Sequence, residues 1–254
     1  MICRCRSTAA VTTPGRAGKK GDIIGTSWIS SKKLKRKDTM EMEDKLKKLI
    51  AGGATAAELA SIRDGWDPEC LTEGTWLHAA VRRGLLPLIA GGATAAELAS
   101  FRGEYECSAL CVAASKCLEH VKGGVTADDL KKDVHAGRSS LFCAVLYGQA
   151  KHIKGPIKKG SLTKAELSEA VRQQCGDIFS HLDGPTLQLL MSLGASQKSL
   201  RGYISRCRKK LRLAVQNNSD AKELYFERLR TLTAVAEKSG MRIRHPADVL
   251  ALLL

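Results

Sequence analysis

The amino-acid sequence predicts an all-α protein in which short helices recur along the chain and stack into a helical-repeat solenoid. Three observations predict it. Residues 49–61, with the sequence LIAGGATAAELAS, recur unchanged at residues 88–100. A Thr-x-x-acid-Leu pattern occurs four times. Aromatic residues make up only 4% of the 254 residues, fewer than a sandwich or barrel of strands normally uses.

The basic residues are concentrated towards the two ends of the chain, whose formal net charge is +15. Residues 1–39 contain ten Lys or Arg, only two acidic residues and few apolar side chains. We therefore predict a disordered basic tail over 1–39, or a start of translation further along, at Met40 or Met42. Residues 40–170 form the predicted repeat region, and residues 171–254 form a C-terminal helical region.

Each repeat is expected to contain a short helix that begins at a threonine. In a capping box, the Thr hydroxyl accepts a hydrogen bond from the N–H three residues later, and the acid at that position reaches back to the Thr N–H. Glycines in front of the threonine end the preceding segment. The four predicted pairs are Thr55 with Glu58, Thr94 with Glu97, Thr126 with Asp129 and Thr163 with Glu166.

A second short helix is predicted after each of the first three threonine-capped helices, within residues 74–85, 108–118 and 139–148. Each segment has a Leu followed three positions later by Ala, and two of the three have Gly seven positions after the Leu. This spacing predicts a helix of two turns. The small residues allow a neighbouring helix to approach closely.

One of these segments has the sequence Gly74-Thr75-Trp76-Leu77-His78-Ala79-Ala80 and is followed by Gly84. This pattern resembles the ankyrin repeat. The resemblance covers roughly residues 45–170. It implies a protein-binding scaffold in which His78 supports neighbouring loops through hydrogen bonds. The usual Pro before the Leu is replaced by Trp, Ala and Ser, and a threonine-capped helix takes the expected place of the family's β-finger. We therefore favour a helical solenoid over an ankyrin fold with well-formed fingers.

The resemblance also implies where a partner protein would bind. The family's partner-facing positions lie just before the turn of each repeat and in the loop before its first helix. Arg82, Arg83 and Tyr147 are the strongest candidates, because Arg and aromatic residues dominate interface energetics. The full set of predicted protein-binding residues is Thr72, Arg82, Arg83, Cys107, Ser115, Lys116, Arg138, Leu146 and Tyr147.

The C-terminal region is predicted to consist of helices that cover the end of the repeats. An apolar stripe of Leu200, Ile204, Leu211 and Val215, with Cys207 between them, predicts an amphipathic helix. Its other faces carry many Lys and Arg. A nucleic-acid-binding protein that uses the basic flanks is therefore the alternative function, and it predicts strongly salt-dependent binding.

The sequence contains no motif for nucleophilic, metal-dependent or nucleotide-dependent catalysis, and we predict a non-enzymatic protein without cofactor or metal. Cys107 and Cys111 are four residues apart, but no second pair completes a zinc site. Nine cysteines without an export signal indicate reduced thiols in the cytoplasm. No apolar run is long enough to span a membrane. We expect a monomer, and a bacterial effector delivered into a host cell stays an open alternative.

Overall fold

The computed structural model describes residues 43–67, 72–102, 107–175 and 183–243, and this part of the chain is mostly helical. The predicted basic tail, residues 1–39, lies outside the described residues. Residues 43–51 form the first described helical segment. Among the described residues, no helix combines the length and hydropathy that crossing a bilayer requires.

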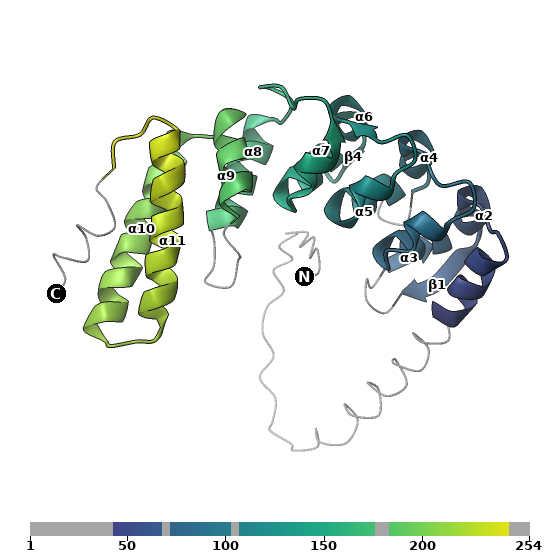
Figure 1. Cartoon of the computed structure of the whole chain (residues 1–254), viewed down its shortest axis with the longest axis horizontal. Coiled ribbons are helices and arrows are strands. Elements are labelled where there is room, and N and C mark those ends of the chain that lie inside the picture. Colours follow the sequence, from purple (N-terminus) through teal and green to yellow (C-terminus); the bar gives the residue numbers. More distant parts are fainter. Residues whose placement is uncertain (1–42, 68–71, 103–106, 176–182, 244–254) are drawn as a thin grey trace, which may run out of the picture.

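The short helices follow one another along an arc in two rows (Figure 1). Helices of the outer row are the predicted threonine-capped ones, and helices of the inner row are the predicted Leu-containing ones. The outer row consists of α2 (Ala56–Ser61), α4 (Ala95–Ser100) and α6 (Ala127–Lys132). The inner row consists of α3 (Trp76–Arg82), α5 (Ala109–Lys116) and α7 (Ser140–Leu146).

Successive inner helices pack against each other, α3 on α5 and α5 on α7, and each outer helix packs on the inner helix that follows it. Leucines at equivalent places fill the space between the rows. These leucines are fully buried: Leu59, Leu77, Leu98, Leu110, Leu130 and Leu141. We call each outer helix together with the inner helix that follows it a unit: α2 with α3, α4 with α5, and α6 with α7. One unit alone leaves such side chains exposed, so adjacent units stabilise each other by burying them.

Antiparallel hairpins connect outer helices to inner helices, which the all-α prediction did not include. β1 (Arg63–Asp67) pairs with β2 (Thr72–Thr75), and β4 (Val134–His135) pairs with β5 (Arg138–Ser139). The turn between β4 and β5 is Ala136-Gly137, and both residues have positive φ, 47° and 75°. Two consecutive residues of positive φ form the tight turn that matches the twist of a two-stranded ribbon. The prediction therefore holds in its coarser form, a mostly helical protein.

Short backbone segments also pair in parallel from one unit to the next. Thr55 pairs with Ala90, and Thr94 pairs with Lys122. β3 (Val125–Thr126) pairs with β6 (Ile153–Lys154) in the same way. Each inner helix is followed by a short 3-10 turn that leads the chain into this pairing: η1 (Leu86–Leu88), η2 (Leu118–His120) and η3 (Gln149–His152).

The remaining helices extend the arc at its C-terminal end: α8 (Lys164–Cys175), α9 (Gly184–Ser192), α10 (Gln197–Gln216) and α11 (Ala221–Lys238). The predicted boundary between residues 170 and 171 falls within α8. Helices α10 and α11 form a hairpin that packs on α8 and α9. The predicted stripe is confirmed for Leu200, Ile204, Cys207 and Leu211, which are buried, while Val215 is half-buried.

Candidate functional site

All four predicted capping boxes are present. The hydroxyl of Thr94 accepts a hydrogen bond from the N–H of Glu97 at 3.3 Å, and the N–H of Thr94 donates to the Glu97 carboxylate at 2.8 Å. The same exchange begins α2 and α6. Thr163 and Glu166 form the fourth box, at 3.2 and 2.9 Å. The prediction of these helix starts is therefore confirmed.

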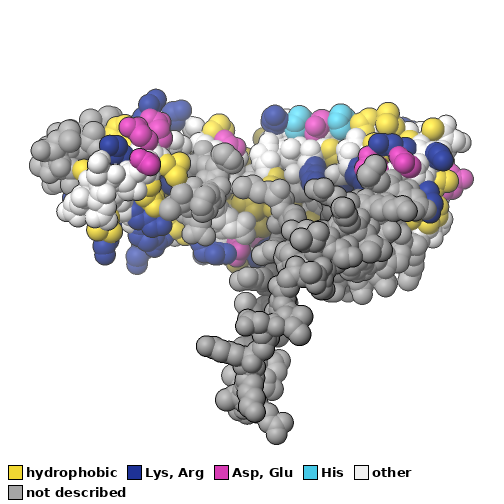
Figure 2. Space-filling view, turned by 90° about the horizontal axis from the view of Figure 1, so that it is seen from below, with side chains coloured by type: hydrophobic (Ala, Val, Ile, Leu, Met, Phe, Trp, Pro, Cys, Tyr) yellow, Lys and Arg dark blue, Asp and Glu magenta, His cyan; other side chains and the backbone are white. Residues whose placement is uncertain are grey.

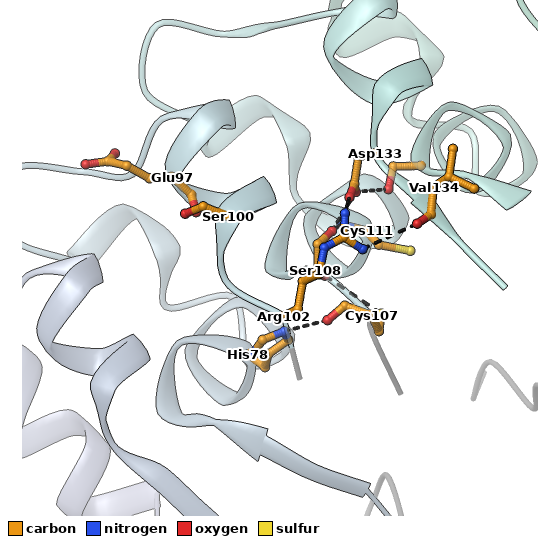
Figure 3. Close-up of polar contacts among 10 residues, drawn as sticks. His78, Glu97, Ser100, Arg102, Cys107, Ser108, Cys111, Asp133 and Val134 are labelled. Carbon is orange, nitrogen blue, oxygen red and sulfur yellow. Dashed lines mark hydrogen bonds and ion pairs between the residues drawn. The ribbon is translucent and has the colours of Figure 1, made fainter. Parts of the chain in front are cut away.

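His78 connects its own repeat to the next one (Figure 3). Its Nε2 atom lies 2.9 Å from the carbonyl oxygen of Cys107, and its Nδ1 atom lies 2.8 Å from the hydroxyl of Thr75. A carbonyl oxygen only accepts, so Nε2 carries the proton and Nδ1 accepts from Thr75. Burial lowers the pKa of His78 below 6.5, because the charged ring is poorly solvated there. The predicted supporting role of His78 is confirmed.

Asp133 is the centre of a polar network between the second and third units (Figure 3). Its buried carboxylate accepts hydrogen bonds from the hydroxyls of Ser108, at 2.5 Å, and Ser140. Arg102 donates to it at 3.3 Å and also to the carbonyl oxygen of Val134. Sequence reasoning missed this network, because a single Asp after two lysines has no distinctive spacing.

Glu166 occupies a comparable place at the next junction. Its carboxylate accepts four hydrogen bonds, from the N–H and hydroxyl of Ser139 and from the N–H and hydroxyl of Thr163, all between 2.6 and 2.9 Å. Burial alone would raise the pKa of Glu166. The hydrogen bonds from Ser139 and Thr163 outweigh it, and the pKa is lowered below 4.5.

The predicted partner-facing residues of α3 and α5 lie beside each other. The Lys116 ammonium, which is exposed, donates to the carbonyl oxygen of Arg82 at 3.2 Å. Arg83 is 13% exposed, and its Nε atom lies 4.0 Å from the carboxylate of Glu43. Ser115 donates to Val112 within its own helix at 2.8 Å. Of these residues, Lys116 is the one that projects into solvent.

The other predicted residues lie further along the inner row or in the hairpins. Leu146 and Tyr147 are half-buried at the end of α7. Arg138 is 43% exposed and forms an ion pair with Glu169 at 3.2 Å. Cys107 is half-buried before α5, and Thr72 begins β2, but the side chain of Thr72 is outside the described part of the structure. The structure thus distributes the nine residues along one row of units.

A shallow depression of about 240 Å³ lies between α4 and α6, over Ala95, Ala99 and Leu110. It is open to solvent, and Arg102 and Asp133 at its edge already bond to each other. Within the described ranges, no group of His, Cys, Asp and Glu residues is arranged to hold a metal ion.

Comparisons with models of protein families, with curated proteins and with solved structures found no match. The functional interpretation therefore depends on the geometry of this chain. Its two informative features are the junctions that recur from unit to unit and the continuous row of inner helices and hairpins beside them.

Proposed function

We propose that this chain is an ankyrin-like helical-repeat scaffold that binds another protein and performs no catalysis itself. The observation that carries the proposal is the recurrence of one backbone pairing between successive units. Thr55 with Ala90, Thr94 with Lys122 and Thr126 with Lys154 all pair in parallel just before a threonine-capped helix. The hairpins before the inner helices, and the link from His78 to Cys107, also support the resemblance.

A row of stacked units is suited to binding a protein. Each unit is held by its neighbours, so the side chains along one side of the array are ordered before a partner arrives. Binding then loses little conformational entropy, and affinity depends on the few residues that make good contacts. The inner helices α3, α5 and α7 line the open side of the arc in Figure 1.

The proposed contact residues are Lys116, Arg138 and Tyr147. Lys116 and Arg138 are exposed cations, and Tyr147 gives an aromatic ring at the end of the next inner helix. We leave Arg83 out of this set, because it is turned towards Glu43 and mostly covered. The chemistry of the three residues favours a partner segment that has acidic and aromatic or aliphatic side chains.

The test is affinity capture from the source cells with the K116A/R138A/Y147A variant, quantified against the wild type. The matched control is K131A/K132A, which removes two exposed cations from the outer helix α6. Both variants are first checked for unchanged thermal unfolding. Loss of a captured protein with the inner-row variant alone supports the proposal. Equal capture by all three proteins contradicts the site.

A second candidate function, nucleic-acid binding, is favoured by the charge of α10. This helix has no acidic residue, and its basic residues are Lys198, Arg201, Arg206, Arg208, Lys209, Lys210 and Arg212, of which all but Arg208 are exposed. Lys and Arg side chains gather at this end of the molecule in Figure 2, at its left. Fluorescence-anisotropy titrations with labelled DNA and RNA test nucleic-acid binding. Binding that weakens steeply with salt and is lost in K209E/R212E supports it, and no binding at low salt contradicts it.

A further inference from the structure

Two thiols from successive units meet at the junction between α5 and α7. The Sγ atom of Cys111 lies 3.7 Å from the Sγ atom of Cys143, across 32 residues of sequence. Both residues are half-buried, so a small oxidant can reach this junction. Cys175 and Cys207, by contrast, are buried in the C-terminal helices.

The surroundings of Cys111 favour its thiolate. Interactions with the nearby side chains of Cys107, Cys143 and Ser140 lower the pKa of Cys111 well below 9.0, and the Cys143 thiol lies within hydrogen-bond distance of its sulfur, at 3.7 Å. His135 adds a favourable electrostatic interaction, and its Nδ1 atom is enclosed without a hydrogen-bond partner. The thiolate is the nucleophilic form of cysteine, so Cys111 combines reactivity with access.

Three other described cysteines, Cys117, Cys175 and Cys207, have pKa values shifted in the opposite direction. Burial raises the pKa of Cys117 to about 11 and that of Cys175 to about 12. Burial also raises the pKa of Cys207. These thiols stay protonated near neutral pH, and protonated thiols react slowly. The reactivity of Cys111 can therefore be compared with that of three unreactive thiols in the same protein.

We propose that Cys111 is a peroxide-reactive cysteine and that Cys143 resolves its oxidised form into a disulfide between α5 and α7. The Cys111 thiolate attacks one oxygen of a hydroperoxide. The S–O bond forms, the O–O bond breaks, and the departing hydroxide or alkoxide takes up a proton. The Cys143 sulfur then loses its proton and attacks the sulfenic sulfur of Cys111. The S–S bond forms and water departs, so the two thiols lose two electrons and the peroxide gains them.

Disulfide formation requires the two sulfur atoms, which lie on helices that pack against each other, to approach from 3.7 Å to about 2.05 Å. The thiol of Cys107 donates to the carbonyl oxygen of Ser108 at 3.8 Å, and we assign the resolving role to Cys143, whose sulfur lies 3.7 Å from that of Cys111. The product is a covalent link between α5 and α7, two helices that pack against each other.

The experiment treats the reduced, full-length protein with one equivalent of hydrogen peroxide, blocks free thiols by alkylation and digests it with trypsin without reduction. We expect a cross-linked pair of peptides, residues 103–116 joined to residues 139–151. The first peptide contains both Cys107 and Cys111, so C107S must keep the cross-link and C111S must abolish it. In C143S, dimedone must label Cys111 as the trapped sulfenic acid.

The control variant is C117S, which removes a buried thiol from the end of the same helix and must cross-link like the wild type. Alkylation rates in the untreated wild type give a measurement that needs no variant. Cys111 must react at least tenfold faster than Cys175 and Cys207. A disulfide from Cys107 to Cys111, an unchanged cross-link in C111S, or equal alkylation rates would each overturn the proposal.

Discussion

The Nε2 atom of His78 donates a hydrogen bond to the carbonyl oxygen of Cys107 at 2.9 Å, and these residues belong to consecutive units of the chain. Asp133 and Glu166 make corresponding polar links at the next two junctions. Each link is buried, so it requires its partner in the neighbouring unit to avoid an unsatisfied polar group. Polar contacts therefore fix how each unit is placed on the next, and leucine packing supplies the burial of apolar surface.

The link through His78 predicts a specific dependence of stability on pH. Burial lowers the pKa of His78 in the folded protein below 6.5, so the unfolded chain takes up a proton first as the pH falls. The contribution of the neutral His78 ring to the free energy of unfolding is complete above about pH 6.5 and is lost as the pH falls below this value. We expect the free energy of unfolding to fall between about pH 7 and pH 5, and H78Q to reduce this slope. Urea unfolding at several pH values in this range measures the free energy of unfolding of both proteins.

The control for this prediction is H120Q, which changes a histidine that is 42% exposed. H120Q keeps His78, so the decrease in the free energy of unfolding that His78 causes between pH 7 and 5 should remain. Because the lowered pKa of Glu166 acts below 4.5, its effect falls in a separate, more acidic range. A slope unchanged in H78Q between pH 7 and 5 would show that the ring is not held in its neutral form.

Asp133 is expected to contribute more to the stability of the protein than the exposed Asp128 of α6. In D133A, the buried hydroxyls of Ser108 and Ser140 lose their common acceptor, and each unsatisfied donor is costly. We expect the free energy of unfolding to fall by about 2–3 kcal/mol. The matched substitution D128A, on the exposed side of α6, should change it little. Similar losses in the two variants, measured by urea unfolding, would contradict the assigned network.

The capping boxes give a third prediction. T126A removes the acceptor for the N–H of Asp129 and should lower the free energy of unfolding by about 1 kcal/mol. T126S keeps a hydroxyl at the same place and should recover most of the loss. If T126S is as destabilised as T126A, the methyl group of the threonine, rather than its hydroxyl, is the important feature. Thermal and urea unfolding of the three proteins distinguish these outcomes.

Local sequence patterns predicted the parts of the fold that depend on near neighbours. The Thr-x-x-acid spacing identified four helix starts, and the apolar stripe identified the buried face of α10. The hairpin at Val134–His135 was missed, because its turn needs positive φ at an alanine, which that residue type rarely adopts.

Residues brought together from separate units could not be predicted in the same way. Asp133 and Ser108 are 25 residues apart, and Cys111 and Cys143 are 32 apart. No motif with internal spacing marks either pair, because their proximity depends on how one unit is placed on the next. His78 is the exception, since the resemblance to the ankyrin repeat implied its role before the link to Cys107 was known.

The C-terminal helices provide the last prediction, which concerns the architecture itself. Leu211 is fully buried in α10, whereas Leu213, two residues later in the same helix, is 48% exposed. L211A should lower the free energy of unfolding by about 2–4 kcal/mol through lost burial and the cavity it leaves. L213A is the matched control and should change it by less than about 0.5 kcal/mol.

Hydrogen exchange in L211A distinguishes a linear array from a protein with one shared core. In an array, each unit contacts only its neighbours, so a defect in α10 weakens nearby helices most. We expect amides of α8 to α11 to lose protection by a larger factor than those of α3 and α5. Equal loss in α3 and α10 would mean that the described helices unfold as one body, and the helical-repeat proposal would then be wrong.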